Sequence, residues 1–307
     1  MRLDDFDPNI NVEDQRGSGG GGFGGLGSGG GDGVLFAFLP FIFNRFGCFG
    51  VAAVIALFVV FGGGLPLLES GNTIGGSSPA VQTAPRGGTD AASSCNLDAS
   101  SKLACNAFSS ADKTWGAIFS QSGQHFAEPK LVFYSGEGRS GCGAAQAAMG
   151  PFYCPTDQGI YLDTSFFQQL SQKFGAPGDF AQDYVIAHEF GHHIQYLLGI
   201  SGKVSSLQRR ASESEANRLS VMLELQADCF AGVWAAKNSD RMDANDLASG
   251  MTAAKAIGDD TLQREMQGRV VPDSFTHGTS EQRMTWLKRG IDAGDMRQCD
   301  TFQGALG

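Results

Sequence analysis

The sequence predicts an α+β protein, mostly helical with a small sheet, in which one transmembrane helix precedes a folded domain. Three observations lead to this prediction. Residues 46–68 form a run of 23 residues without a charged side chain, long enough for a helix to cross a hydrocarbon layer of about 30 Å. Beyond this run, apolar patterns of helical period outnumber short strand-like runs. Gly-rich and Ser/Thr/Pro-rich stretches, which are typical of linkers, lie on either side of it.

The N-terminal part is predicted to be a tail, a membrane helix and a linker. Residues 1–45 form the tail, in which residues 17–33 include 12 glycines, a low-complexity composition. Residues 46–68 follow as a single-pass helix, and residues 69–94, poor in core-forming side chains, as a flexible linker. Arg45 precedes the helix and Glu69 follows it, so the positive-inside rule places the N-terminus in the cytoplasm. We therefore expect the domain, residues 95–307, on the periplasmic or extracytoplasmic side of the inner (cytoplasmic) membrane.

Charge and cysteine content narrow the class of protein further. The net charge of −10 argues against nucleic acid as a partner, because phosphate binding needs clustered Lys and Arg. Six cysteines follow the apolar run without CxxC spacing, an even number that fits up to three disulfides in an oxidising compartment. Fifteen pairings are possible, and six buried reduced thiols are the alternative. We favour Cys95–Cys105, Cys142–Cys154 and Cys229–Cys299.

The folded domain is predicted to contain six helices and three strands. The helices are expected at residues 107–121, 166–174, 180–198, 208–236, 244–257 and 280–291, and the strands at residues 130–134, 151–154 and 159–162. For the third helix, Asp179 and Gln182 form a candidate capping box, and Gly199 suits its C-terminal end.

The third helix contains VIAHEFGHHIQYLLG, residues 185–199, with three of the five histidines of the chain. His188 and His192 are four residues apart and share one face, and Glu189 lies about 100° around the helix from His188. This HExxH pattern is typical of a site in which two imidazoles bind Zn²⁺ and the glutamate acts on water as a general base. His193 lies about 140° from His188, so we exclude it as a ligand; it either tunes Glu189 or hydrogen-bonds to backbone. The alternative is a pair of ordinary core histidines.

The fourth helix supplies candidate partners for this metal. Residues 221–234, VMLELQADCFAGVW, are apolar on nearly every side, yet they include Glu224 and Asp228, four residues apart on one face. Buried carboxylates need strong partners. Glu224 as third zinc ligand and Asp228 as acceptor for a ligand histidine would satisfy both. Glu213 and Glu215 are competing candidates for the ligand role, but they lie in a polar segment that indicates a solvent-exposed helix surface.

At this point the sequence resembles the bacterial membrane-anchored family described as putative neutral zinc metallopeptidases. The resemblance covers nearly the whole chain and rests on NVEDQRG (residues 11–17), GPFYCPTDQGIYLD, AHEFGHHIQ, ELQADCFAGVW, PDSFTHGTSEQR and the final CDTF. Gln15 departs from it, where a basic residue is expected. The resemblance implies a zincin-like fold with one zinc per chain, and its likeness to gluzincin peptidases supports Glu224 as ligand and Asp228 as its supporting residue.

The same resemblance implies two further features. Residues 159–162 (GIYL) are placed to be the edge strand along which a peptide substrate lies, although an ordinary core strand would look the same. His277 could donate a hydrogen bond to the oxyanion, with a loop-capping histidine as the alternative. Arg283 could pair with Asp228 or with a ligand carboxylate.

Together these observations predict a membrane-anchored zinc endopeptidase that acts on a peptide or protein substrate. Zn²⁺ would be held by His188, His192 and Glu224, with Glu189 as general base. The alternative is a non-catalytic or latent zinc-binding adaptor of the cell envelope. The presence of Glu189 favours the peptidase, because a structural metal site has no need of a base.

Overall fold

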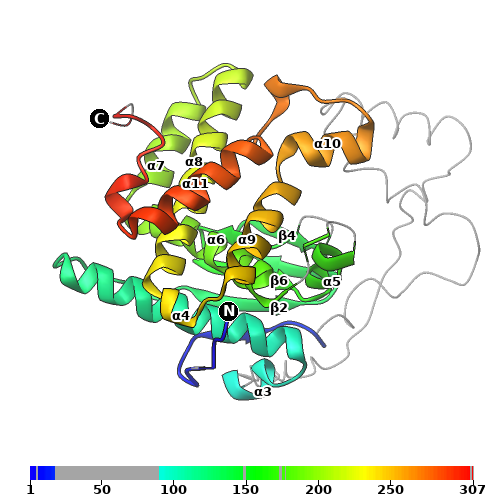
Figure 1. The fold of residues 1–307 in the computed structure, drawn as a ribbon, viewed down its shortest axis with the longest axis vertical. Helices are drawn as coiled ribbons and strands as arrows, with labels where there is room; N and C mark the ends of the chain where they lie inside the picture. The colour runs from blue at the N-terminus through cyan, green and yellow to red at the C-terminus, as the bar shows by residue number, and fades with distance from the viewer. Residues whose placement is uncertain are drawn as a thin grey trace, which may run out of the picture. The chain divides into compact units, whose positions relative to one another are not determined.

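The computed structural model describes residues 1–17 and 90–306, which all belong to one compact unit (Figure 1). The predicted transmembrane helix, residues 46–68, and nearly all of the predicted linker lie outside the described residues. Within the two described ranges, seven single positions are also left out: Asp5, Ala148, Met149, Lys173, Phe174, Pro177 and Ala305.

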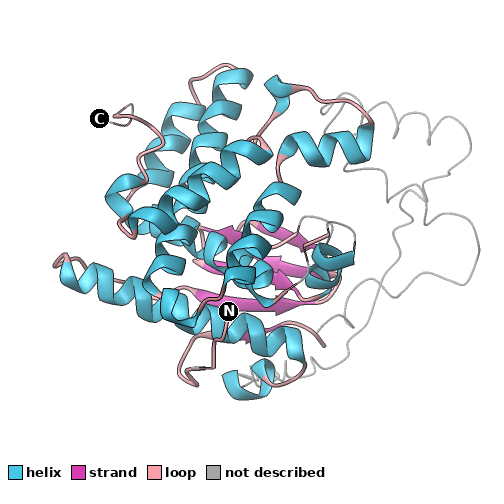
Figure 2. Cartoon of the chain, in the orientation of Figure 1, coloured by secondary structure: helices cyan, strands magenta, loops and turns pink. Residues whose placement is uncertain are grey.

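A four-stranded sheet in the order β1-β2-β6-β5 lies among the helices of the unit (Figure 2). β1 (Val12–Asp14), β2 (Lys130–Tyr134) and β6 (Gly159–Asp163) run parallel, and β5 (Phe152–Cys154) runs antiparallel to β6. β6 is buried along its whole length, as expected for an apolar strand covered on both faces. The prediction that residues 159–162 form an edge strand is therefore wrong. β6 lies inside the sheet, and its neighbour β5 forms the edge.

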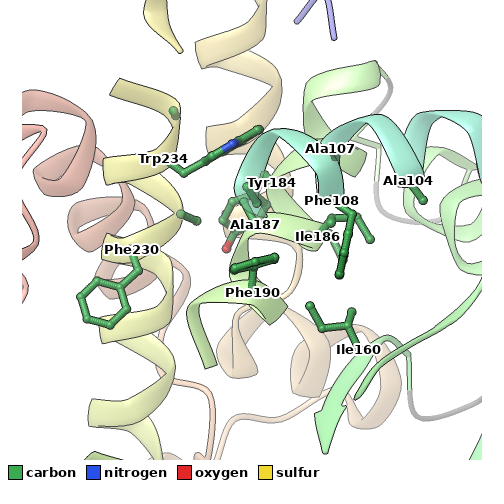
Figure 3. Packing of buried hydrophobic residues seen from close by; sticks show 14 of the residues in the cluster. Ala104, Ala107, Phe108, Ile160, Tyr184, Ile186, Ala187, Phe190, Phe230 and Trp234 are labelled. Atoms are coloured by element: carbon green, nitrogen blue, oxygen red, sulfur yellow. The ribbon is translucent and has the colours of Figure 1, made fainter. Parts of the chain in front are cut away.

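The two faces of the sheet are covered by different elements. Helices α4 (Ala99–Gln121) and α6 (Asp179–Leu197) build the main core, in which Phe108, Ile160, Ile186 and Phe190 meet (Figure 3). A smaller apolar cluster joins β2, β5 and β6 to Ala145 of the hairpin formed by β3 (Glu137–Ser140) and β4 (Gly143–Gln146). This packing fixes α6 against the sheet.

The other helices form a bundle beside α6 (Figure 1). α8 and α11 approach so closely that a Cβ atom at Gly290 would lie 2.0 Å from the carbonyl oxygen of Cys229. Of the described helices, α8 alone is long and apolar enough to span a membrane by length and composition, but its second half is buried in this bundle and it is a core helix. The bundle consists of α7 (Ile200–Gln208), α8 (Glu213–Lys237), α9 (Ala244–Ala256), α10 (Asp259–Gln267) and α11 (Ser280–Ala293). α5 (Ser165–Gln172) lies apart from it, beside the sheet (Figure 1), and the remaining described helical pieces are α3 (Ala91–Cys95) and three 3-10 turns.

Several boundaries differ from the sequence prediction for local reasons. The helix expected at residues 208–236 starts five residues later, as α8 at Glu213, because Ser212 caps α8 in a reciprocal capping box with Glu215. The helix α7 before it was not predicted from the sequence. Asp179 is not a cap as expected but the first residue of α6, whose N-cap is Gly178. α4 starts eight residues early, at Ala99, where the Asp98 side chain accepts from the backbone N–H of Ser101.

The three disulfides are the pairs that we favoured from the sequence. Cys95–Cys105 ties α3 to α4, Cys142–Cys154 ties the β3–β4 turn to β5, and Cys229–Cys299 ties α8 to the C-terminal segment. The first pair and the helix α3 show that the domain begins earlier than residue 95. Residues 1–17, expected in the tail, also belong to this unit and contribute β1.

Candidate metal centre

The two helices that carry the predicted ligands lie against each other at a glycine. A Cβ atom at Gly191, between the two histidines of α6, would lie 2.9 Å from the carbonyl oxygen of Ala227 on α8. Only a residue without a side chain permits this approach. It places His188, His192 and Glu224 so that one potential ligand atom from each lies within 4.8 Å of the others, and no other such group of three occurs among the described residues.

The two imidazoles are oriented so that Nε2 of each faces Glu224. His188 Nε2 lies 3.1 Å from Glu224 Oε2, and His192 Nε2 lies 3.4 Å from Glu224 Oε1. Each Nδ1 has its own acceptor: Asp228 Oδ1 at 2.8 Å from His188 and Gln195 Oε1 at 2.9 Å from His192. An N–H held at Nδ1 leaves the Nε2 lone pairs for a metal.

Charge also favours a cation here. Burial raises the pKa of Glu224, but His192 and His188 overcome this effect and hold it well below its usual value. Burial likewise opposes protonation of His188, yet the Asp228 carboxylate raises its pKa to about 9. A cation at Nε2 therefore competes with a proton at the same nitrogen. Two imidazole nitrogens and a carboxylate are the donor set that zinc accepts at catalytic sites.

Asp228 is the centre of a buried polar cluster behind the histidines. Its carboxylate is fully buried and accepts from Arg283 Nε and Nη2, both at 2.9 Å, and from Tyr184 Oη at 2.5 Å, besides its contact with His188. Burial raises the pKa of Asp228, but Arg283 and His188 together outweigh this effect and hold the pKa below its usual value. Arg283, itself 2% exposed, thus pairs with Asp228, one of the two partners expected.

Gln195 is a supporting residue that the sequence prediction missed. Besides accepting from His192, its amide donates to the carbonyl oxygen of Leu223 at 2.7 Å and to Gln226 Oε1 at 3.1 Å. Gln226 in turn donates to the carbonyl oxygen of Cys299. An amide three residues after His192, on the same side of the helix, was the available signal.

The candidate ligands open onto a cavity of about 610 Å³ that combines polar and apolar side chains. Glu189 and His277 line it with the ligands, while Phe152 and Tyr153 of β5 line it from the sheet edge. Both residues predicted to act in catalysis are therefore placed beside the candidate metal ligands.

His277 is held by an acidic residue that the sequence did not reveal. Its Nδ1 lies 3.2 Å from Asp259 Oδ1, and Asp259 Oδ2 accepts the backbone N–H groups of Thr276, His277 and Gly278. The hydrogen bond to Asp259 raises the pKa of His277, and the imidazole remains half-exposed, at 49% of its side chain. His277 is thus oriented by one side while the rest of the ring remains accessible.

The other histidines lie away from the ligands. His193 hydrogen-bonds through Nε2 to the carbonyl oxygen of Ala127 at 2.7 Å, which is the backbone contact among the two roles considered from the sequence. Burial lowers its pKa to about 4, so the ring is neutral and Nδ1 accepts from Tyr153 Oη at 3.0 Å. His193 therefore links α6 to the edge strand β5. His125 is exposed and does not line the cavity.

Comparison with known proteins gives a family but no characterised relative. The family model described as "Putative neutral zinc metallopeptidase" matches residues 1–302. "Uncharacterized protein YpfJ" of Escherichia coli strain K12 is 54% identical over 209 residues, which cover 67% of this chain and 73% of that protein. "Uncharacterized protein Rv2575" of Mycobacterium tuberculosis strain H37Rv is 41% identical over 193 residues, covering 59% and 64%. No solved structure matches the chain.

Proposed function

The chain belongs to the family described as putative neutral zinc metallopeptidases, and from this premise we propose that it is a membrane-anchored zinc endopeptidase whose site lies outside the cytoplasm. The observation that carries this proposal is the convergence of His188, His192 and Glu224 beside Glu189 on one cavity. Three disulfides favour an oxidising compartment for the domain.

Zinc fits the residues present. His188, His192 and Glu224 would hold one ion, with Asp228 and Gln195 fixing the two imidazoles through their Nδ1 atoms. Bound there, the ion would supply Lewis acidity that polarises a peptide carbonyl and lowers the pKa of water.

Glu189 is the residue to which we assign the proton transfers. Its carboxylate lies in the cavity one position along α6 from His188. It would accept a proton from the water that attacks the scissile carbonyl and return that proton to the leaving amine nitrogen, which breaks the C–N bond.

His277 is assigned to the developing negative charge on the carbonyl oxygen. Asp259 holds its Nδ1 and raises its pKa, so the imidazole keeps a proton with which to donate a hydrogen bond. Removal of one such donor typically costs about 10²–10³ in kcat.

β5 is the element along which we place the peptide. It is the last strand of the described sheet, and Phe152 and Tyr153 line the cavity beside the candidate ligands. Backbone pairing with an extended peptide would give binding that tolerates many sequences, while the apolar walls select for apolar side chains.

The test uses the full chain purified in detergent, as wild type, Glu189→Gln and Glu224→Ala. Zinc is measured by elemental analysis and cleavage with casein. We expect one zinc in the wild type and in Glu189→Gln, cleavage by the wild type alone, and loss of zinc in Glu224→Ala. Glu213→Gln, an exposed position at the start of α8, is the matched control and should behave as wild type.

The remaining outcomes decide against parts of the proposal. Zinc in the wild type without cleavage of casein or a peptide library would favour the adaptor or latent form. Cleavage that survives in Glu189→Gln would remove this residue from the mechanism, and a protein without zinc would refute the ligand assignment.

A further inference from the structure

The first 17 residues are built into the same folded unit as the candidate metal centre. β1 pairs in parallel with β2, with Val12 opposite Leu131 and Asp14 opposite Phe133. The backbone N–H of Leu131 donates to the carbonyl oxygen of Asn11 at 2.9 Å, and the backbone N–H of Gln15 donates to the carbonyl oxygen of Phe133 at 2.7 Å. β1 thereby covers an edge of β2 that would otherwise present unpaired backbone groups.

Side chains reinforce this pairing at both ends of β1. Glu13 accepts from Lys130 at 2.9 Å. The Arg16 side chain is only 10% exposed and donates to both carboxylate oxygens of Asp14. It also donates to Ser101 Oγ at 2.6 Å and to the carbonyl oxygen of Ser94 at 2.9 Å. It thus joins the N-terminal segment to α3 and α4, the first elements of the second described range.

The residues before β1 contact two further parts of the unit. Asn106 of α4 donates to the carbonyl oxygen of Leu3 at 2.7 Å, and the backbone N–H of Asp7 donates to Ser109 Oγ. The backbone N–H of Arg2 donates to the carbonyl oxygen of Arg241, after α8. Ile10 is 8% exposed within the main core. The segment is therefore attached along its whole length.

This attachment limits how the intervening chain can meet a membrane. Residues up to Gly17 and residues from Asp90 onward belong to the unit, and residues 91–95 form α3, in which the carbonyl oxygen of Ser94 accepts from Arg16. Two ends held in one folded unit lie on one side of a bilayer, so the chain between them crosses it an even number of times or not at all. Only residues 46–68 are long enough to span; the apolar run at residues 34–43 has ten residues, about half the length needed.

We propose that residues 1–17 and residues 90–306 lie on the same side of the membrane, and that the chain is attached to the bilayer from that one face without passing through it. This replaces the expectation of a single-pass anchor with a cytoplasmic N-terminus. A single crossing would require β1 to leave the sheet, which strips Arg16 of its partners on α3 and α4 and leaves the edge of β2 open. The inference is independent of the peptidase chemistry.

The test compares the accessibility of two exposed positions in the full chain. Asn9→Cys reports on the N-terminal segment and Ser239→Cys on the domain, each combined with Cys48→Ser. Intact spheroplasts and lysed cells are treated with a membrane-impermeant maleimide. We expect both positions to react to the same extent in intact spheroplasts. Reaction of Ser239→Cys before lysis and of Asn9→Cys only after lysis would overturn the inference. Protection of both before lysis would support it while refuting the extracytoplasmic site.

A cross-link tests the docking itself. In Glu13→Cys/Lys130→Cys, a short bismaleimide should join the two positions in isolated membranes. A protease site inserted among residues 69–89 then releases two pieces that remain linked on a denaturing gel. Asn9→Cys/Lys130→Cys is the control pair without the Glu13–Lys130 contact, and its pieces should separate. Separation of the pieces in the test pair as well would refute docking in the membrane.

Discussion

Replacement of the buried Arg283 of α11 by leucine should destabilise the domain far more than the loss of an exposed salt bridge on the same helix. The Arg283 side chain is 2% exposed and the Asp228 carboxylate is fully buried, so Arg283→Leu leaves a buried charge without its main partner. Such changes cost about 3–5 kcal/mol. His188 and Tyr184 still contact Asp228, so we expect the lower end, about 3 kcal/mol.

The matched control is Lys288→Leu, five residues further along α11. Lys288 also pairs with an aspartate, Asp292, at 2.6 Å, but both side chains are 60% exposed. An exposed pair of this kind contributes roughly 0–0.5 kcal/mol. For a unit of this size each kcal/mol shifts Tm by about 2–4 °C, so Arg283→Leu should lower Tm by about 6–12 °C and Lys288→Leu by about 2 °C or less.

The assay is thermal unfolding of the full chain in detergent, with disulfides intact and a chelator present so that zinc does not contribute. The double variant Arg283→Leu/Asp228→Leu removes both charges and should recover part of the lost Tm. Equal Tm losses for Arg283→Leu and Lys288→Leu would refute the reasoning, because burial would then make no difference to the pair.

Three further predictions concern the site and a carboxylate of α4. His277→Ala should lower kcat on casein about 10²–10³-fold with zinc content unchanged, while His125→Ala, at an exposed position, should match the wild type; equal kcat values would exclude His277 from catalysis. Gln195→Ala should weaken zinc binding about 10–100-fold in a chelator competition because His192 loses its acceptor, and Gln195→Glu, which keeps an acceptor oxygen, should lose less. Burial, with nearby acidic side chains, raises the pKa of Asp112 to about 7, so the folded protein keeps a proton that the unfolded chain releases, and stability falls as pH rises from about 4 to 7. In urea unfolding at pH 8, Asp112→Asn should therefore have a free energy of unfolding about 1–2 kcal/mol above that of the wild type, a value already reduced for screening by solvent. This gain in stability should vanish at pH 4, and a gain that does not depend on pH would show another cause.

The grouping of His188, His192 and Glu224 could be predicted from the sequence because each of the two halves of the candidate site is local. His188 and His192 on one helix, and Glu224 and Asp228 on another, are each four positions apart, and the apolar residues around them indicated burial. The spacing could not show that Gly191 lets the two helices approach at Ala227, which is what brings the halves together.

Residues whose role depends on distant parts of the chain could not be predicted in the same way. Asp259 lies 18 positions before His277, and the two meet only because the loop before α11 brings His277 back to the start of α10. The role of Gln195 depends on its hydrogen bond to Leu223 of α8. β1 has no strand pattern of its own: its three residues are half-buried and two are acidic. The choice of residues 159–162 as edge strand failed because an apolar run does not reveal which neighbours a strand has.

The pairing of β1 with β2 also sets the order in which the protein can be completed. Val12 is made 119 positions before its partner Leu131. At a synthesis rate of about 5–20 residues per second, the N-terminal segment waits roughly 6–24 s before its place in the sheet exists. β1 can join the sheet only after residues 46–68, the predicted membrane segment, have been made. A cell must therefore deliver both flanks of that stretch to the same compartment while they are still unpaired, and a chaperone that covers the N-terminal segment during this interval would favour correct assembly.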